Sequence, residues 1–222
     1  WSFTTEGVNS MKIKKIAALC SWAGTFRLYN KMDGEGVITQ WLGTGNALYP
    51  LNGLPLLDEE SLCAMFDIPE KKREKLVILC EDMPEIIDVA DKDPKETLLE
   101  EKEMTIGYNG MQMIPLRTKD GIIFIGEQFL EPLADEIDFL NLYERKTPKG
   151  VSYVAVKAGM MLRGIIAPYD VVTDKKFITQ LELLLIDSKR ELEKITISNC
   201  STADQDDGQQ SIFEDADESK EG

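Results

Sequence analysis

Two stretches of ten residues, LYNKMDGEGV at 28–37 and LYERKTPKGV at 142–151, determine the fold expected for this chain. Both begin with Leu-Tyr, both end with Gly-Val, and they lie 114 residues apart (142 − 28 = 114). The same offset aligns further landmarks on either side: Ile16 with Leu130, Leu19 with Leu133, Gly45 with Gly159, and Leu48 with Leu162. Self-similarity at a fixed spacing indicates repeated structural units. We therefore expect residues 16–57 and 130–172 to follow the same chain path, with chance similarity as the alternative.

Hydrophobic periodicity, close to 3.6 in helices and 2 in strands, predicts the elements of both units. In the first part we expect helices at 11–22 and 58–67 and strands at 25–29, 37–43, 46–51 and 75–80, the last one buried. In the second part we expect helices at 127–138 and 174–195 and strands at 139–144, 151–157 and 160–167. Asn109-Gly110 and Asp120-Gly121 each lie between alternating residues, which predicts two hairpins. The expected fold class is α+β, with a mainly antiparallel sheet, helices, and two duplicated clamp-like helix–strand–hairpin–helix units.

This pattern divides the chain into five segments. Residues 1–10 precede Met11 and are expected to be a non-native or over-extended N-terminus. Residues 11–81 form the first unit, 82–103 an acidic mobile excursion with some helix, and 104–195 the second unit with its long C-terminal helix. Residues 196–222 hold eight acidic residues and one lysine. Such a composition cannot bury enough apolar surface to fold, so we expect a disordered acidic tail.

Composition limits the classes of function. The 222 residues carry a formal net charge of −15, and 43% of them are hydrophobic, as is typical of an acidic globular protein. An acidic surface repels phosphates, so a protein partner is expected rather than broad nucleic-acid binding. The sequence has no run long enough to cross a membrane, and its four cysteines lack CxxC spacing. We therefore expect a cytoplasmic protein with buried, reduced thiols and no membrane association.

The absence of histidine removes the commonest general base and the usual nucleophile pairs, so we expect no catalytic centre, cofactor or metal site. The one enzyme-like pattern is Asp138 followed by Glu144-x-Lys146 on a predicted strand. Two carboxylates and a lysine in this order can hold Mg²⁺ and steady an attacking water, as in divalent-metal nucleases. A solvated strand edge with alternating charges is the favoured alternative, because charged residues are abundant in this chain.

The acidic tail carries one isolated apolar pair, Ile212-Phe213, within the sequence QQSIF at 209–213. Apolar pairs in such segments are typical of short linear motifs that bind a partner's pocket. QQSIF resembles the pentapeptide by which many proteins bind the bacterial sliding clamp. The resemblance implies that Gln209 enters a polar subsite, that Ser211 occupies the third position, and that Ile212 and Phe213 fill an apolar pocket. An accidental match is one alternative, and a tail that imitates DNA or shields a basic patch is another.

The layout of helix, strand, loop and hairpin, ending in IIAPYDVV at 165–172, resembles one repeat of a DNA sliding clamp. The resemblance covers residues 127–172 and again 11–57, and it implies a ring-forming homo-oligomer whose basic helices face DNA. The first predicted helix carries Lys12, Lys14 and Lys15, whereas the matching helix of the second unit has five acidic residues and no basic one. The stretch at 41–68 is similar to uncharacterised proteins encoded by prophages of gut Firmicutes, which implies a phage context.

These observations favour a non-enzymatic, phage-derived accessory protein of DNA replication or repair whose tail binds the host sliding clamp. Two alternatives stay open: a phage processivity factor that itself forms a clamp-like homo-oligomer, and a divalent-metal-dependent nuclease that uses Asp138, Glu144 and Lys146. The oligomeric state would distinguish the first alternative, and metal-dependent DNA cleavage the second.

Overall fold

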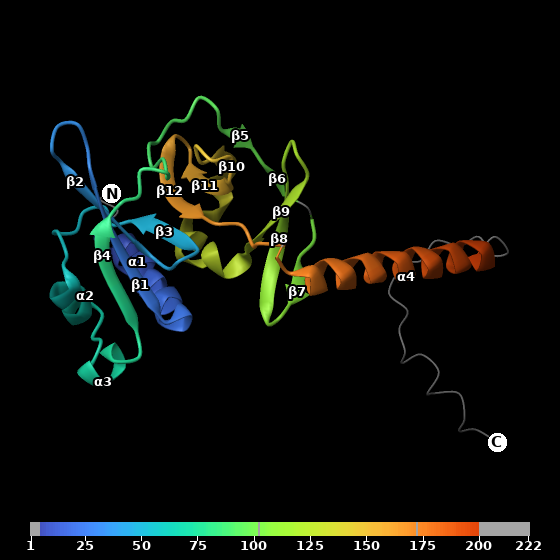
Figure 1. Cartoon of the computed structure of the whole chain (residues 1–222), viewed down its shortest axis with the longest axis horizontal. Coiled ribbons are helices and arrows are strands. Elements are labelled where there is room, and N and C mark those ends of the chain that lie inside the picture. Colours follow the sequence, from blue (N-terminus) through green and yellow to red (C-terminus); the bar gives the residue numbers. More distant parts are fainter. Residues whose placement is uncertain (1–4, 102, 172, 200–222) are drawn as a thin grey trace, which may run out of the picture. The chain divides into compact units, whose positions relative to one another are not determined.

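The computed structural model describes residues 5–101, 103–171 and 173–199, and it has the expected α+β architecture of helices and mainly antiparallel strands (Figure 1). The chain divides into two compact units, residues 1–170 and 171–222. The first unit holds two sheets with their helices, and the described part of the second unit holds helix α4, Lys175–Asn199. Residues 16–57 and 130–170 of the predicted repeat therefore lie in the first unit.

The larger sheet of the first unit has eight strands in the order β4-β1-β2-β3-β12-β11-β10-β5. Every neighbouring pair is antiparallel except β1 with β4, which is parallel. The strands are β1 (Thr25–Met32), β2 (Ile38–Gly43), β3 (Ala47–Pro50), β4 (Val77–Asp82), β5 (Thr97–Leu98), β10 (Leu140–Lys146), β11 (Ser152–Ala158) and β12 (Met161–Ile166). The meander β1-β2-β3 and the meander β10-β11-β12 thus meet in the middle of one sheet, through the pairing of β3 with β12.

The two meanders repeat each other in register as well as in strand order. Leu28 pairs with Leu42 between β1 and β2, and Leu142 pairs with Val156 between β10 and β11, so both partners move by 114 residues. Next to the turn, the hairpin β2-β3 and the hairpin β11-β12 also agree, since Gly43 pairs with Leu48 and Lys157 pairs with Leu162. Farther from the turn, a bulge at Val156/Lys157 shifts the pairs of β11 and β12 by one residue. The two meanders therefore share strand order and strand direction.

The helices differ more from expectation than the strands do. Helix α1 is Thr5–Ala23, so residues 5–10, which the sequence led us to set aside, are helical. The helix expected at 127–138 consists of two 3₁₀ segments, η1 (Glu127–Phe129) and η2 (Glu131–Phe139). Pro132 would lie inside a continuous helix over 127–138, where it lacks the N–H for the bond to residue 128 and its ring clashes with that carbonyl, whereas the first turn of η2 tolerates it. The remaining short helices are α2 (Glu59–Met65) and α3 (Glu70–Arg73).

The smaller sheet contains both predicted hairpins. Its strands are β6 (Glu100–Glu101), β7 (Ile106–Tyr108), β8 (Met111–Arg117) and β9 (Ile122–Gly126). Asn109 and Gly110 form the two-residue turn between β7 and β8, with φ of +50° and +77°. Positive φ at both central positions is what this tight hairpin requires, which explains the Asn-Gly sequence.

Adjacent residues of the large sheet face two different apolar clusters. Leu28 and Leu42 pack in a cluster with α1, α2, η1, η2 and residues of the smaller sheet, while Tyr29 and Trp41 pack in another cluster with Met83. This second face is covered by residues 83–96, which we call the strap (Figure 1). The strap connects β4 at one edge of the sheet to β5 at the other. The described residues 82–101 contain two short strands and no helix, so the helix expected in this acidic segment is absent from them.

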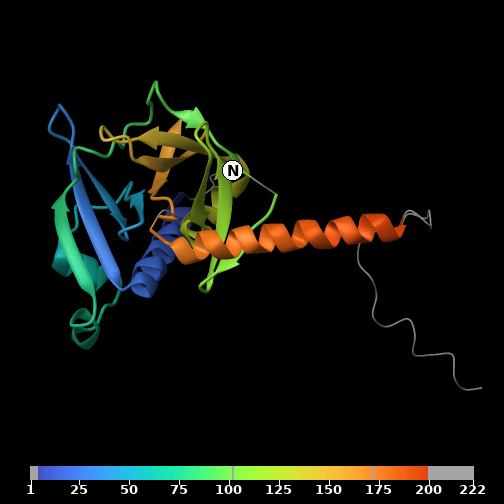
Figure 2. The ribbon, with the colours of Figure 1, turned by 45° about the vertical axis from the view of Figure 1, so that its right-hand side comes forward.

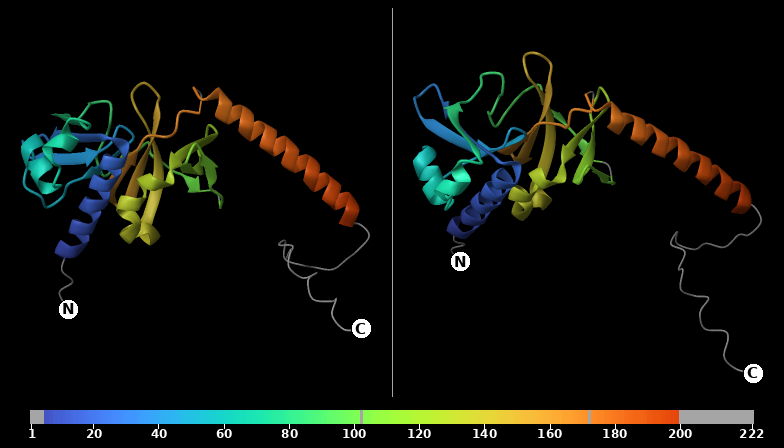
Figure 3. Two further views of the ribbon diagram at one scale, coloured as in Figure 1. Left: turned by 90° about the horizontal axis from the view of Figure 1, so that it is seen from below. Right: turned by 60° about the horizontal axis from the view of Figure 1, so that its bottom comes forward.

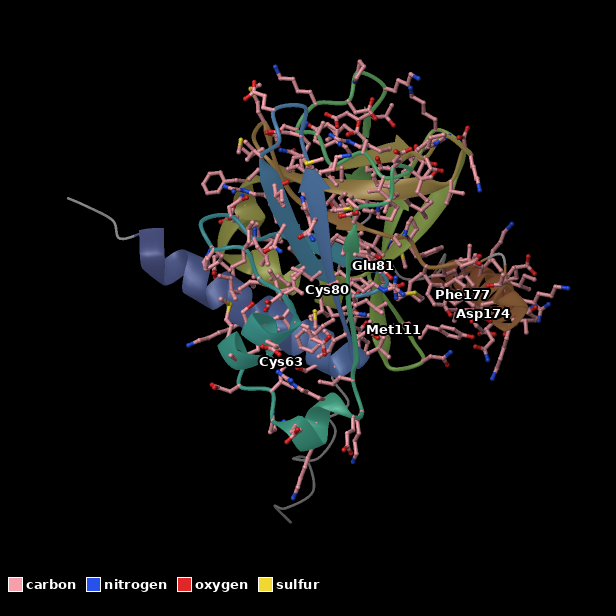
Figure 4. The ribbon with its side chains drawn as sticks, turned by 60° about the vertical axis from the view of Figure 1, so that its left-hand side comes forward. Cys63, Cys80, Glu81, Met111, Asp174 and Phe177 are labelled. Atoms are coloured by element: carbon pink, nitrogen blue, oxygen red, sulfur yellow. The ribbon has the colours of Figure 1, made fainter. Side chains whose placement is uncertain are left out.

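Strand β4 lies at the edge of the sheet (Figure 2) and was expected to be buried. It is mostly exposed, because only one side pairs with another strand. Cys63 on α2 is buried, as predicted, and so is Cys20, whereas Cys80 on β4 is exposed (Figure 4). All three thiols are free. The prediction of buried thiols is therefore wrong for Cys80.

Candidate functional site

The best candidate for a ligand site is a cavity of about 370 Å³ between the two repeated parts of the first unit. Its walls come from α1, from the segment after β3, from η2 and from β12, and α1 and η2 lie side by side (Figure 3). Pro50, Leu51 and Leu133 contribute apolar wall, and charged residues of α1, η2 and β12 surround it. The volume lies at the small end of the range for small-molecule sites.

The charges around this cavity are mostly paired. Lys15 of α1 binds Asp135 of η2 with 3.1 Å between Nζ and Oδ1. Arg163 of β12 lies against Glu136, with 2.9 Å between Nε and Oε2. The Lys15–Asp135 pair shows that the acidic η2 faces the basic α1, and the Arg163–Glu136 pair joins η2 to β12. Lys12 has no salt bridge within the part of the chain whose side chains are described.

The amine of Lys12 is the most perturbed group at the cavity. Burial lowers its pKa to about 8, and the positive charge of Arg163 adds to this effect, while Glu136 acts in the opposite direction. A buried lysine that forms no salt bridge favours a nearby anionic group, because such a group stabilises its charged form, and Glu136 already has this effect on Lys12. The cavity thus combines a buried amine that forms no salt bridge with an apolar wall and with two carboxylates, Asp135 and Glu136.

A second polar cluster fixes the strap to the sheet and is buried. Arg145 of β10 is fully enclosed and donates to Glu96 of the strap through Nε at 2.9 Å and Nη2 at 2.6 Å. Its other donors reach the backbone carbonyls of Asp88 and Ala90 at 3.2 and 2.8 Å. Lys157 of β11 binds the second oxygen of Glu96 at 2.6 Å. This cluster is organised like a structural clasp, since every donor is directed at the strap.

Burial alone would raise the pKa of Glu96, but hydrogen bonds from Lys157 and Arg145 outweigh it, and the pKa is lowered. The carboxylate is therefore held in its ionised form. Two further contacts support the strap: Tyr153 exchanges hydrogen bonds with the backbone of Asp88, and the backbone of Leu162 donates to the Asp91 carboxylate at 2.8 Å.

The residues of the nuclease-like pattern have other partners in the structure. Ser152 donates to the Glu144 carboxylate at 2.6 Å, and Lys146 binds Asp120 at 2.6 Å. Glu144 and Lys146 share a strand face, with 3.9 Å between Oε1 and Nζ, while Asp138 belongs to η2. Among the described residues, no group of three or more histidine, cysteine, aspartate or glutamate side chains is arranged to hold a metal ion.

The expectation of a solvated strand edge around Glu144 is wrong. Glu144 and Arg145 are only 5% and 1% exposed. The strap covers Arg145, and Glu144 accepts a hydrogen bond from Ser152 of the neighbouring strand.

Sequence reasoning missed both polar clusters. The signal for the cavity was present in the opposite charges of the two helical segments, which we took as a difference rather than as complementarity. The signal for the clasp was weaker, because Glu96 and Arg145 are 49 residues apart. The tail residues Gln209, Ser211, Ile212 and Phe213 lie outside the described residues.

Comparison with known proteins gives no match: neither a family model, nor a curated protein, nor a solved structure is significantly similar to the chain. Within the described residues, no helix is both long and apolar enough to span a membrane.

Proposed function

We propose that this chain is a non-enzymatic, phage-derived accessory protein of DNA replication or repair that acts by binding proteins and docks on the host sliding clamp through Gln209–Phe213. The observation that carries the proposal is the sequence QQSIF, which matches the clamp-binding pentapeptide at every restricted position. An apolar pair in an otherwise acidic segment is accounted for if it fills a pocket on a partner.

The body of the protein supports a protein partner over a nucleic acid. Several of its basic side chains are neutralised within the molecule: Lys15 by Asp135, Lys157 and Arg145 by Glu96, Lys146 by Asp120, and Arg163 by Glu136. Of the three lysines of α1, one lines the cavity and one is paired, so α1 does not present a continuous basic face. DNA binding depends on clustered unpaired cations that release counterions from the phosphates.

The direct test is a titration of a labelled peptide of residues 204–218 against a purified bacterial sliding clamp. Burial of Ile212 and Phe213 contributes about 3–6 kcal/mol, and ordering the peptide offsets much of it, so we expect a Kd on the order of micromolar. The full-length double variant Ile212→Ala/Phe213→Ala should lose binding and keep the melting temperature of the body. Equal binding by the wild-type and doubly substituted peptides, or no saturation at tens of micromolar, would contradict the proposal.

A second candidate function, a clamp-like processivity factor, is favoured by one observation: the strand register repeats at 114 residues across a single sheet. Such a factor would need a stable ring of two or three copies held by the first unit. A monomeric first unit in solution, or a chain that does not stimulate processive DNA synthesis by a polymerase, would exclude this function. The tail proposal would survive that outcome unchanged.

A further inference from the structure

Helix α4 carries large apolar side chains that are exposed. It has 25 residues, Lys175–Asn199, and Leu185 and Leu192 are each 62% exposed. Most helices in proteins are stabilised by packing of an apolar face rather than by intrinsic propensity. Exposed apolar surface of this kind marks an interaction site.

The apolar residues of α4 follow a heptad pattern. Ile178, Leu181, Leu185, Leu192 and Ile195 occupy alternating spacings of three and four residues, and Ser188 fills the one remaining position. In the usual heptad notation these are successive a and d positions, beginning with Ile178 at a and Leu181 at d. Such a seam is the sequence signature of helices that pair with other helices by interlocking side chains.

We propose that α4 pairs with α4 of a second copy of this chain in an antiparallel two-helix coiled coil. In that arrangement an a position faces a d position of the other helix. Leu181 then packs against Leu192 of the partner subunit, and Leu185 packs beside Ser188 of the partner subunit. Two-fold symmetry repeats both contacts. Each copy therefore uses the same surface, and the assembly is a closed dimer.

Charge favours the antiparallel direction. Glu182 and Lys189 both occupy e positions, and e positions face each other only when the helices run in opposite directions. Glu182 therefore lies beside Lys189 of the partner subunit on both sides of the seam. A parallel pair would place Ser188 against Ser188 of the partner subunit in the core, and it would join two C-terminal segments that each carry eight acidic residues and one lysine.

The seam is short, covering about two and a half heptads, whereas stable coiled coils sustain the pattern over about three to four. We therefore expect a dimer with a Kd on the order of micromolar. This inference does not depend on the proposed function, because it rests on α4 alone.

Sedimentation velocity of the full-length chain from about 1 to about 300 µM tests the pairing. The wild-type chain should shift from monomer to dimer across this range. Leu185→Asp buries a carboxylate in the seam and should weaken dimerisation at least about 30-fold. Leu183→Asp is the matched control, since it makes the same change on an equally exposed leucine two residues away, outside the a and d positions. The control should dimerise like the wild type, and circular dichroism should show equal helix content in both variants.

Charge exchange tests the direction of pairing. Glu182→Lys and Lys189→Glu should each weaken the dimer, and the double variant should restore it, because opposite charges again face each other. In a parallel pair no such restoration is expected. A chain that stays monomeric, an oligomer that survives Leu185→Asp, or equal effects of the Leu185 and Leu183 changes would overturn the proposal, the second outcome pointing to assembly through the first unit instead.

Discussion

Replacing Arg145 by methionine is expected to detach the strap from the large sheet. The guanidinium of Arg145 is fully enclosed and bridges Glu96 to the carbonyls of Asp88 and Ala90. Methionine has a similar length and is apolar, but it cannot donate a hydrogen bond. The change would therefore leave a largely buried carboxylate with Lys157 as its remaining cation, and the Ala90 carbonyl without its donor, while the Asp88 carbonyl keeps the hydroxyl of Tyr153.

The magnitude follows from the burial of the cluster. Breaking a buried ion pair by removing one partner typically costs about 3–5 kcal/mol, because the other charge stays desolvated. The double variant Arg145→Met/Glu96→Gln removes that stranded charge, so it should be destabilised by about 1–3 kcal/mol less than the sum of the single variants. Lys146→Met is the matched control on the same strand. Its side chain is 46% exposed and pairs with an exposed Asp120, so its loss should have a much smaller effect.

Two measurements check this expectation. Urea unfolding gives the loss of stability in each variant, and hydrogen exchange of amides in residues 83–96 reports on the strap itself. Because the pKa of Glu96 is lowered, its contribution to stability is present at neutral pH and is lost as pH falls through the acidic range, and Arg145→Met should flatten this dependence. If Arg145→Met costs no more than Lys146→Met, or if exchange in the strap is unchanged, the clasp has been misidentified.

Three further changes test other parts of the structure. Gly43→Ala would bring its Cβ to 1.9 Å from the Ala47 carbonyl oxygen and should destabilise by at least about 2 kcal/mol in urea unfolding, whereas Gly45→Ala, with its nearest atom at 4.0 Å, should be close to neutral. Tyr49→Phe leaves the buried Phe129 carbonyl without its hydroxyl donor and should cost about 1–3 kcal/mol, measured the same way; a neutral result would contradict the bond. Lys12→Met should stabilise by about 1–3 kcal/mol at pH 7, because it removes a desolvated ammonium. That advantage should shrink as pH rises from about 8 to 10.5, where wild-type Lys12 loses its proton, and an advantage independent of pH would refute the assignment.

The repeated meanders could be predicted from the sequence because local signals determine them. Loops of equal length between Leu-Tyr and Gly-Val set the same register twice, and Asn109-Gly110 encodes its own turn. Strand β4 was misjudged for the opposite reason. Its apolar run is equally compatible with a central and an edge position, and its place is decided by a parallel pairing with β1, which is distant in the sequence.

The clasp could not be predicted because its charged residues come from distant segments. Alternation along β10 indicates only that Glu144 and Arg145 point to opposite faces. Which face of β10 is exposed to solvent depends on where the strap lies, and the attachment of the strap in turn depends on Arg145. Such mutual dependence between distant segments has no local signature, and it reversed our expectation of a solvated strand.

Matched positions of the two meanders carry different side chains. Positions 114 residues apart share backbone register, yet Arg145 corresponds to Lys31 and Lys157 corresponds to Gly43. The second meander can therefore bind Glu96 with two cations, whereas at one of these positions the first meander has no side chain at all. Gly43 is required where it stands, since any Cβ would collide with the Ala47 carbonyl. Over the second meander the strap is held by the Glu96 ion pairs and by apolar contacts, whereas over the first meander Met83 packs in the apolar cluster of Tyr29 and Trp41. The polar fastening is expected to weaken in acid while the apolar fastening persists, so hydrogen exchange at low pH should open the strap first at its Glu96 end.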